Sequence, residues 1–285
     1  LVSGENLPLF TSCCPAWVKF CENRYPEFRK NISTCRSPQE MFGALLKEEA
    51  RMNAAKDREE GREPKKTMVV SIMPCTAKKA EITRPEHFTD GEQNVDYVLT
   101  TTEITRMIQE AGIDLAQVQP EALDMPFGLS SGAGAIFGVT GGVTEAVLRR
   151  LVNNNRTEAL EEISFSGIRG VEGIKEAKID LNGREVKIAV VNGLHCAEEL
   201  LDKMKAGEAH YDFVEVMACK RGCIAGGGQP VPIGPRTKKA RLEGIYKIDS
   251  MAQIKLSSEN PIVATVYEGI LKGKEHKLLH NDIHK

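Results

Sequence analysis

The spacing of apolar residues predicts amphipathic helices separated by short strands. In residues 38–58, apolar side chains recur at helical spacing at Met41, Leu45 and Met52, and Ser37 is a candidate N-cap followed by proline. The same criteria predict helices over residues 102–111, 143–152 and 195–205, and one that starts at Asn260.

Short apolar runs predict the strands. They cover residues 67–73, 94–99, 174–181, 184–191 and 213–217, and Asn182-Gly183 between two of them is a strong hairpin signal. Strands that alternate with helices predict an α/β fold with mostly parallel sheets flanked by helices. Residues 1–36 are predicted as a loop-rich entry, and the chain after residue 235 as a basic stretch followed by a helical, polar tail.

Composition narrows the class of protein. The 285 residues are enough for two lobes around a shared cleft. With 41% hydrophobic and 27% charged residues and a net charge of −2, the chain is an ordinary globular protein without the basic excess of a nucleic-acid binder. We find no apolar run long enough for a membrane span and no signal peptide, and therefore expect a cytoplasmic protein. The start at Leu1 leads us to expect further sequence upstream.

The cysteines carry most of the chemical information. A chain of this length does not need disulfides for stability, and most of these thiols lie in Gly- or Pro-flanked turns beside Met and Lys, which favours a metal site in a reducing compartment. Three of them, Cys21, Cys35 and Cys196, are interpreted as ordinary core or surface thiols. The other five are Cys13, Cys14, Cys75, Cys219 and Cys223.

The first of three cysteine motifs is Thr-Ser-Cys-Cys-Pro-Ala-Trp at residues 11–17. Neighbouring side chains diverge, so one cysteine can bind a metal while the other faces a different side of it. The alternative is a buried thiol pair packed against Trp17, and this motif alone does not decide between the two.

The second motif, Met-Pro-Cys-Thr-Ala-Lys-Lys-Ala-Glu at residues 73–81, follows a predicted strand. Lys78, three residues after Cys75, can present a compact cation to an anionic ligand. The alternative, a helix with ordinary surface lysines, is the better interpretation of Lys79. The third motif also follows a strand, and because ligands bind at the carboxyl ends of parallel strands, we expect Cys75 and Cys219 at one end of the sheet.

The third motif runs from Glu215 to Pro230 and contains Cys219, Cys223 and three successive glycines at residues 226–228. Two cysteines four residues apart can bind one metal unit, and the glycines allow the backbone to approach a bulky cofactor. A structural zinc site is the alternative, but no second compact Cys/His pair completes a zinc ribbon. Together, four thiolates from distant segments suit a [4Fe–4S] cluster and leave one cysteine for chemistry.

The three motifs resemble, in order and without gaps, the three signature motifs of the [FeFe]-hydrogenases. Residues 37–39, 126–128 and 131–143 also resemble segments of that family. The resemblance implies an H-cluster, which is a [4Fe–4S] cubane joined through a cysteine to a diiron unit with carbonyl, cyanide and azadithiolate ligands. It also implies reversible oxidation of H2 to protons and electrons.

The resemblance assigns a role to each residue by its motif position. Cys14, Cys75, Cys219 and Cys223 would hold the cubane, with Cys223 as the bridge to the diiron unit. Cys13 would pass protons to the bridging amine, Lys78 would donate a hydrogen bond to a cyanide, and Ser33 matches a serine of the family's proton path. The glutamates of that path have no clear match here, because Glu5 is the only acid upstream. The remaining pocket residues would be Ser37, Gln39, Met73, Ala77, Phe137 and Met217.

The resemblance also implies an organisation and a set of partners. We expect a catalytic domain over residues 1–235, with the active site in a cleft between two lobes, and a region over residues 236–285 that resembles the small subunit. Expected partners are ferredoxin, or iron–sulfur or flavin domains or subunits, and maturation proteins. The alternatives are a cubane-only relative of the iron–sulfur assembly type, an H2-sensing relative, and a structural zinc or simple electron-transfer module.

Overall fold

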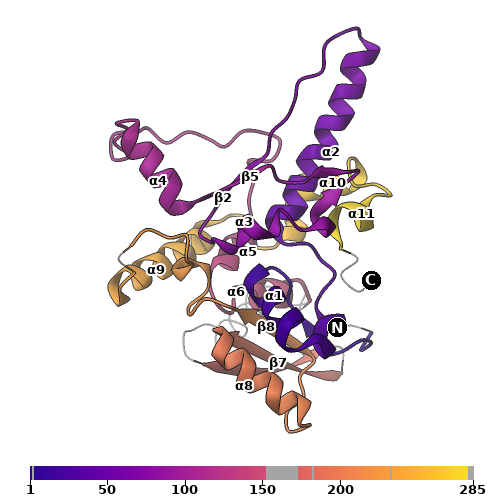
Figure 1. Cartoon of the computed structure of the whole chain (residues 1–285), viewed down its shortest axis with the longest axis vertical. Coiled ribbons are helices and arrows are strands. Elements are labelled where there is room, and N and C mark those ends of the chain that lie inside the picture. The colour runs from indigo at the N-terminus through magenta and orange to yellow at the C-terminus, as the bar shows by residue number, and fades with distance from the viewer. Residues whose placement is uncertain (2, 152–172, 182, 232, 282–285) are drawn as a thin grey trace.

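A four-stranded sheet forms one half of the computed structural model, which describes residues 1, 3–151, 173–181, 183–231 and 233–281 (Figure 1). Its central strand β8 pairs in parallel with β1 and with β7, and β7 pairs with β6 in an antiparallel hairpin. The sheet is therefore mixed. The strand order is β1 (Leu9–Phe10), β8 (Phe213–Met217), β7 (Arg184–Asn192) and β6 (Ile174–Leu181).

The two central strands contribute to two separate cores because successive side chains point to opposite faces. One face of the sheet carries Val214 and Val216 and packs against α1 (Pro15–Arg24) and α8 (Leu194–Lys205). The opposite face carries Phe213 and packs against Leu148 of α6 (Gly142–Leu151). Burial on both faces explains why β8 reads as a continuous apolar run apart from Glu215.

A second, smaller sheet is formed by β2 (Val70–Met73) and β5 (Tyr97–Thr100), which pair in parallel. Each strand is followed closely by a helix, α3 (Ala77–Glu81) after β2 and α4 (Thr101–Glu110) after β5. Val69, Val95 and Val98 form a small core there with Ile82. The long helix α2 (Pro38–Glu59) starts beside this core, and Figure 1 shows its far end extending away from the body.

The C-terminal region packs back onto the earlier chain. Arg149 of α6 forms a buried, two-pronged ion pair with Asp249 of α9, at 2.8 and 2.7 Å. Leu271 and Leu278 pack against the first half of α2. Within the described residues, the α-helices of this region are α9 (Pro235–Met251), α10 (Pro261–Glu268) and α11 (Glu275–Leu279). Earlier in the chain lie α5 (Gly132–Ala135), β3 (Phe88–Thr89) and β4 (Glu92–Gln93).

The α/β class is confirmed, but the sheets are mixed as well as parallel. The predicted helices and strands are all present within a few residues of their expected ends, although Asn182 of the predicted turn and residue 152, the predicted end of one helix, lie outside the described residues. Two helices were not predicted. The loop-rich entry contains α1, since Pro15 occupies its first turn, and the basic stretch after residue 235 is the helix α9. No helix within the described residues combines the length and apolar character that crossing a bilayer requires.

Candidate iron–sulfur and proton-transfer site

The first cysteine pair lies where β1 gives way to α1. Cys14 is the N-cap of α1 in an extended conformation, and its carbonyl accepts the Val18 amide. Trp17 is fully buried, and its indole N–H donates to the Thr11 carbonyl at 3.0 Å. The indole therefore anchors the turn that carries both cysteines.

The other cysteine motifs meet this turn from two different sheets. Cys75 follows β2 of the small sheet, whereas Cys219 follows β8 of the large one. The expectation of one shared sheet end was therefore wrong. The two loops are nevertheless in contact, because the Gly228 amide donates to the Pro74 carbonyl at 3.1 Å.

Glycines make this close contact possible. A Cβ atom on Gly226 would overlap the Pro74 carbonyl oxygen, and one on Gly228 would lie 2.8 Å from the Cys75 nitrogen. Gly222 has a φ of +83°, and a Cβ there would lie 2.7 Å from the Thr140 nitrogen. The Gly-rich loop is therefore pressed backbone to backbone against its neighbours on both sides.

The four candidate ligand thiols lie within electrostatic range of one another. Burial raises the pKa of Cys14 and Cys219, and it raises the pKa of Cys223 to about 12. The charge of Cys75 acts in the same direction on all three of these thiols. Four thiolates at these positions would repel one another, and a cationic iron–sulfur unit would relieve that repulsion.

The arrangement differs from that of a mononuclear metal centre. Across the part of the chain that the structure describes, no three His, Cys, Asp or Glu side chains are grouped to hold a single ion. A cubane binds each thiolate to a different iron atom, so its ligands stand further apart than those of one zinc ion.

Cys13 lies on a cavity of about 580 Å³ that also contacts two other predicted residues, Ser33 and Phe137. Burial raises the pKa of the Cys13 thiol, with further contributions from the charges of Cys14 and Glu215. Ser33 accepts the Cys35 amide at 3.2 Å. Met73, Ala77 and Met217 do not line this cavity. Met73 packs against the small core, Ala77 faces a separate hollow beside α1, and Met217 is buried at the end of β8.

Lys78 and its neighbours form a buried polar cluster. The ammonium, with the residue 7% exposed, donates to the Cys13 carbonyl at 3.1 Å and to Glu81 Oε2 at 2.7 Å. The same carboxylate oxygen accepts Ser37 Oγ at 2.9 Å and Gln39 Nε2 at 2.8 Å. Three predicted pocket residues, Lys78, Ser37 and Gln39, therefore donate hydrogen bonds to the same oxygen atom of Glu81.

Two buried glutamates had no role in the sequence analysis. Glu81 organises the cluster just described. Glu215 is fully buried, and it accepts the Gly141 and Thr144 amides at 2.7 Å each, at the start of α6. An acidic residue inside a buried strand is the signal that points to Glu215, because such a carboxylate needs several donors. Both residues belong to cysteine motifs, Glu81 to the second and Glu215 to the third, but their residue type alone did not indicate a function.

Glu40, also fully buried, has a pKa raised to about 7, mainly by burial and then by the charge of Glu81. Since the unfolded carboxyl titrates near 4.5, the folded protein binds an extra proton between the two values. Glu40 therefore contributes stability below pH 4.5 that is lost as the pH rises through about 7, with a slope of at most about 1.4 kcal/mol per pH unit.

We expect Glu40→Gln to remove this slope from the free energy of unfolding, measured by urea denaturation between pH 4.5 and 8. His87 acts in the opposite direction, because burial lowers its pKa to about 3 and its contribution is lost as the pH falls below 6.5. The difference between the two proteins isolates Glu40, and parallel curves for variant and wild type would contradict the prediction.

A family model places the chain among known proteins. Residues 1–227 match the model described as iron only hydrogenase large subunit, C-terminal domain. The chain belongs to this family, the [FeFe]-hydrogenases. Residues 235–284 match a second model, the iron hydrogenase small subunit.

Individual [FeFe]-hydrogenase relatives agree with the family match. The chain is 42% identical over 288 residues to NADP-reducing hydrogenase subunit HndD of Solidesulfovibrio fructosivorans, covering 99% of this chain and 48% of that protein. It is 45% identical over 255 residues to the periplasmic [Fe] hydrogenase large subunit of Nitratidesulfovibrio vulgaris, covering 88% and 59%. The chain thus spans about half the length of these relatives.

A solved structure gives the same result in three dimensions. An [FeFe]-hydrogenase studied for oxygen inactivation, with an H cluster that contains a 2Fe subcluster, has a TM-score of 0.75 and 36% identity, covering 98% of this chain and 75% of that one. Similarity to the cytosolic iron–sulfur assembly component 3 of Mus musculus is lower, at 32% identity over 297 residues, covering 99% of this chain and 60% of that protein. Sequence identity therefore favours the hydrogenases over the assembly proteins.

Proposed function

We propose that this chain is the H-cluster domain of an active [FeFe]-hydrogenase, which interconverts H2 with protons and electrons. The observation that carries the proposal is that Cys13, with its thiol, and the ammonium group of Lys78 lie together beside four cysteines that are close enough for their charges to affect one another. Lys78 donates to the backbone of Cys13, and Cys13 is the immediate neighbour of a candidate cluster ligand, Cys14.

The residues present fit the cofactor that the family implies. The donor set is sulfur only, as is usual for a [4Fe–4S] cubane, and the loop with Cys219 and Cys223 lies against the loop with Cys75 through the close backbone contacts of Gly226 and Gly228. Cys14, Cys75, Cys219 and Cys223 would hold the cubane, and Cys223 would bridge to the diiron unit with its carbonyl, cyanide and azadithiolate ligands.

When bound, the diiron unit supplies the metal and amine groups at which H2 is split or formed. The chain's own residues would orient the ligands of this unit, exclude water from it and move protons to and from it. Lys78 is a buried cation that can donate to an anionic ligand, and its charge-assisted hydrogen bond would orient that ligand. Polar contacts would come from Ser37 and Gln39, and Met73, Met217, Ala77 and Phe137 would exclude water.

Proton transfer falls to Cys13. Its thiol keeps its proton at neutral pH because burial and neighbouring negative charge raise its pKa. A thiol at this place can give the proton from Sγ and take it back, which is what a general acid and base requires. Ser33, on the same cavity, is the next polar group that we assign to the path.

The wider assignments are part of the proposal. The matches of residues 1–227 and 235–284 to two family models support a catalytic domain over 1–235 and a small-subunit-like region over 236–285. We also propose a reducing, cytoplasmic location, where thiols stay reduced and available as ligands. Electrons would come from ferredoxin or from iron–sulfur or flavin domains or subunits, and maturation proteins would supply the diiron unit.

Infrared spectroscopy of anaerobically matured protein tests the function directly. We expect bands from metal-bound carbonyl and cyanide, and their complete loss in Cys223→Ser. Cys196→Ser is the matched control, because this half-buried thiol packs against the large core away from the cluster loops. Absence of the bands from wild-type protein that contains the cubane would contradict the proposal and favour a cubane-only relative.

A further inference from the structure

The carboxylate of Glu81, the last residue of the second cysteine motif, binds three side chains that are assigned to the cofactor pocket. The residue is 3% exposed, and its Oε2 atom accepts hydrogen bonds from Lys78, Ser37 and Gln39 at 2.7–2.9 Å. We propose that Glu81 is a positioning residue, whose charge fixes these three side chains in the cofactor pocket before the cofactor binds. The inference rests on the proposed function, because that function assigns the three residues to the pocket.

The charges explain why a glutamate is needed. A buried ammonium is costly unless an anion compensates it. Glu81 lies at contact distance from Lys78 Nζ, whereas the other acceptor, the Cys13 carbonyl, is neutral. The neighbouring Glu40 contacts Gln39 and Asn94 at the longer distances of 3.3 and 3.5 Å. The compensating charge for Lys78 is therefore that of Glu81.

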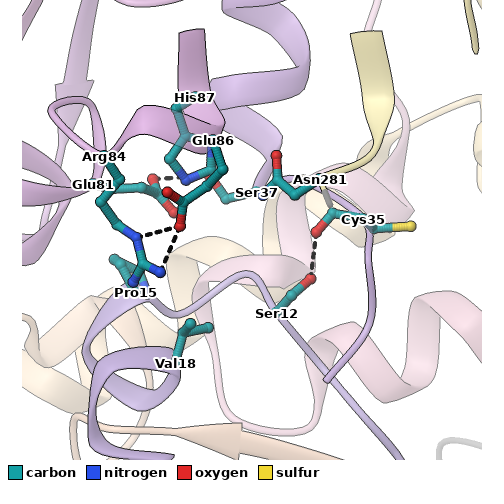
Figure 2. A pocket seen from close by; sticks show the side chains of 10 residues that line it. All are labelled: Ser12, Pro15, Val18, Cys35, Ser37, Glu81, Arg84, Glu86, His87 and Asn281. Carbon is teal, nitrogen blue, oxygen red and sulfur yellow. Dashed lines mark hydrogen bonds and ion pairs between the residues drawn. The ribbon is translucent and has the colours of Figure 1, made fainter. Parts of the chain in front are cut away.

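The contacts also join separate parts of the chain. Ser37 is the N-cap of α2 and Gln39 lies in its first turn, while Lys78 and Glu81 belong to α3. Through Lys78, the cluster reaches the turn that carries Cys13. Figure 2 shows Glu81 and Ser37 on the wall of one small cavity with Ser12 and His87. One carboxylate thus fixes the relative positions of two helices and the first cysteine motif.

The geometry has a consequence for Lys78. An ammonium group has three N–H donors, and within the described residues two of them are directed to Glu81 and to the Cys13 carbonyl. These two contacts fix the direction of the third donor. Glu81 would thereby determine where an anionic cofactor ligand meets the lysine.

The test uses three variants of the full chain. E81Q removes the charge but keeps the shape, E81D keeps the charge but shortens the side chain, and E86Q is the control. Glu86 is an acid of the same region that pairs with Arg84 rather than with Lys78. In cofactor-free protein, acylation of Lys78 by an amine-reactive reagent is measured by peptide mass spectrometry. In matured protein, the cyanide infrared bands are recorded.

We expect Lys78 to be acylated about tenfold faster in E81Q than in wild type, since a hydrogen bond to a charged group is lost. The cyanide bands of matured E81Q should shift or split, and E86Q should match wild type in both measurements. If E81Q does not fold, E81D replaces it, and we expect intermediate protection because the shorter side chain cannot reach all three donors.

Equal protection of Lys78 in the folded variant and wild type would overturn the inference, as would unchanged cyanide bands in matured E81Q. If the proposed function itself is wrong, the two measurements give a different pair of results. Wild-type protein would then lack cyanide bands altogether, while the acylation experiment on cofactor-free protein would still report on Glu81.

Discussion

Cys13→Ala is expected to lower hydrogen turnover by about 10²–10⁴-fold, the range that a positioned general acid and base contributes. The thiol is the protonated group next to a candidate cluster ligand, and it shares a cavity with Ser33. Alanine removes the proton carrier but leaves the Cys13 carbonyl, so the contact with Lys78 Nζ is retained. Cofactor binding should therefore survive the substitution.

Turnover is measured as H2 evolution with a chemical reductant, and the infrared bands of the same sample report the cofactor content. Cys196→Ala is the control, since it removes a half-buried thiol from the helix α8, which packs on the large sheet. Turnover within threefold of wild type in Cys13→Ala, at equal cofactor content, would show that the thiol does not carry the proton.

Gly226→Ala should disrupt the assembly of the iron–sulfur site. The new methyl group would overlap the Pro74 carbonyl oxygen, which is backbone and cannot rotate away. The loop that carries Cys219 and Cys223 must then move away from the loop that carries Cys75. Overpacking of this kind costs about 1–3 kcal/mol or more. Here the cost appears as a loss of cluster binding, because the displaced thiols no longer fit one cubane.

The measurement is iron and acid-labile sulfide per chain after anaerobic reconstitution. We expect at least a fivefold decrease for Gly226→Ala, with an unchanged far-ultraviolet circular dichroism spectrum. Gly234→Ala is a matched control, since no atom lies within 4 Å of the position of its Cβ and its φ of −83° suits alanine. Wild-type iron content in Gly226→Ala would mean that the two loops can separate without losing the site.

The periodic parts of the fold could be predicted from the sequence. The start of α2 at Pro38 and the strand β8 over residues 213–217 follow from capping and apolar runs. Helix α1 was not found in this way, because apolar residues fill nearly every position from Cys14 to Cys21, so no single apolar face stands out over its ten residues. Helix α9 was missed because its sequence is basic and has few apolar positions, with Asp249 as its buried residue.

Sheet membership depends on contacts between distant residues, which local patterns do not encode. The Met-x-Cys groups after β2 and β8 look alike in sequence but end strands of separate sheets. Their meeting point depends on the close approach of Gly226 and Gly228 to the backbone of Pro74 and Cys75. The glycines were recognised as permitting close approach, but their partner could not be read from local sequence.

The candidate site was predictable where residue type alone limits the chemistry. Cysteine and lysine side chains in a turn have few possible roles, so Cys13 and Lys78 could be identified from the sequence as candidate site residues. The role of a glutamate depends on what surrounds it. Glu81 and Glu86 are five residues apart in sequence, yet one binds three buried donors and the other pairs with a partly exposed arginine. Only the three-dimensional environment separates them.

The pairing of β1 with β8 determines when the site can form during synthesis. Phe10 of β1 pairs with Val214 of β8, so about two hundred further residues must be synthesised before the strand that precedes Cys14 can pair. The ribosome must therefore release the chain at least as far as β8 before the thiols can converge. A cluster would be inserted only after that point, and a nascent chain that stalls before β8 would offer a cluster donor no assembled site.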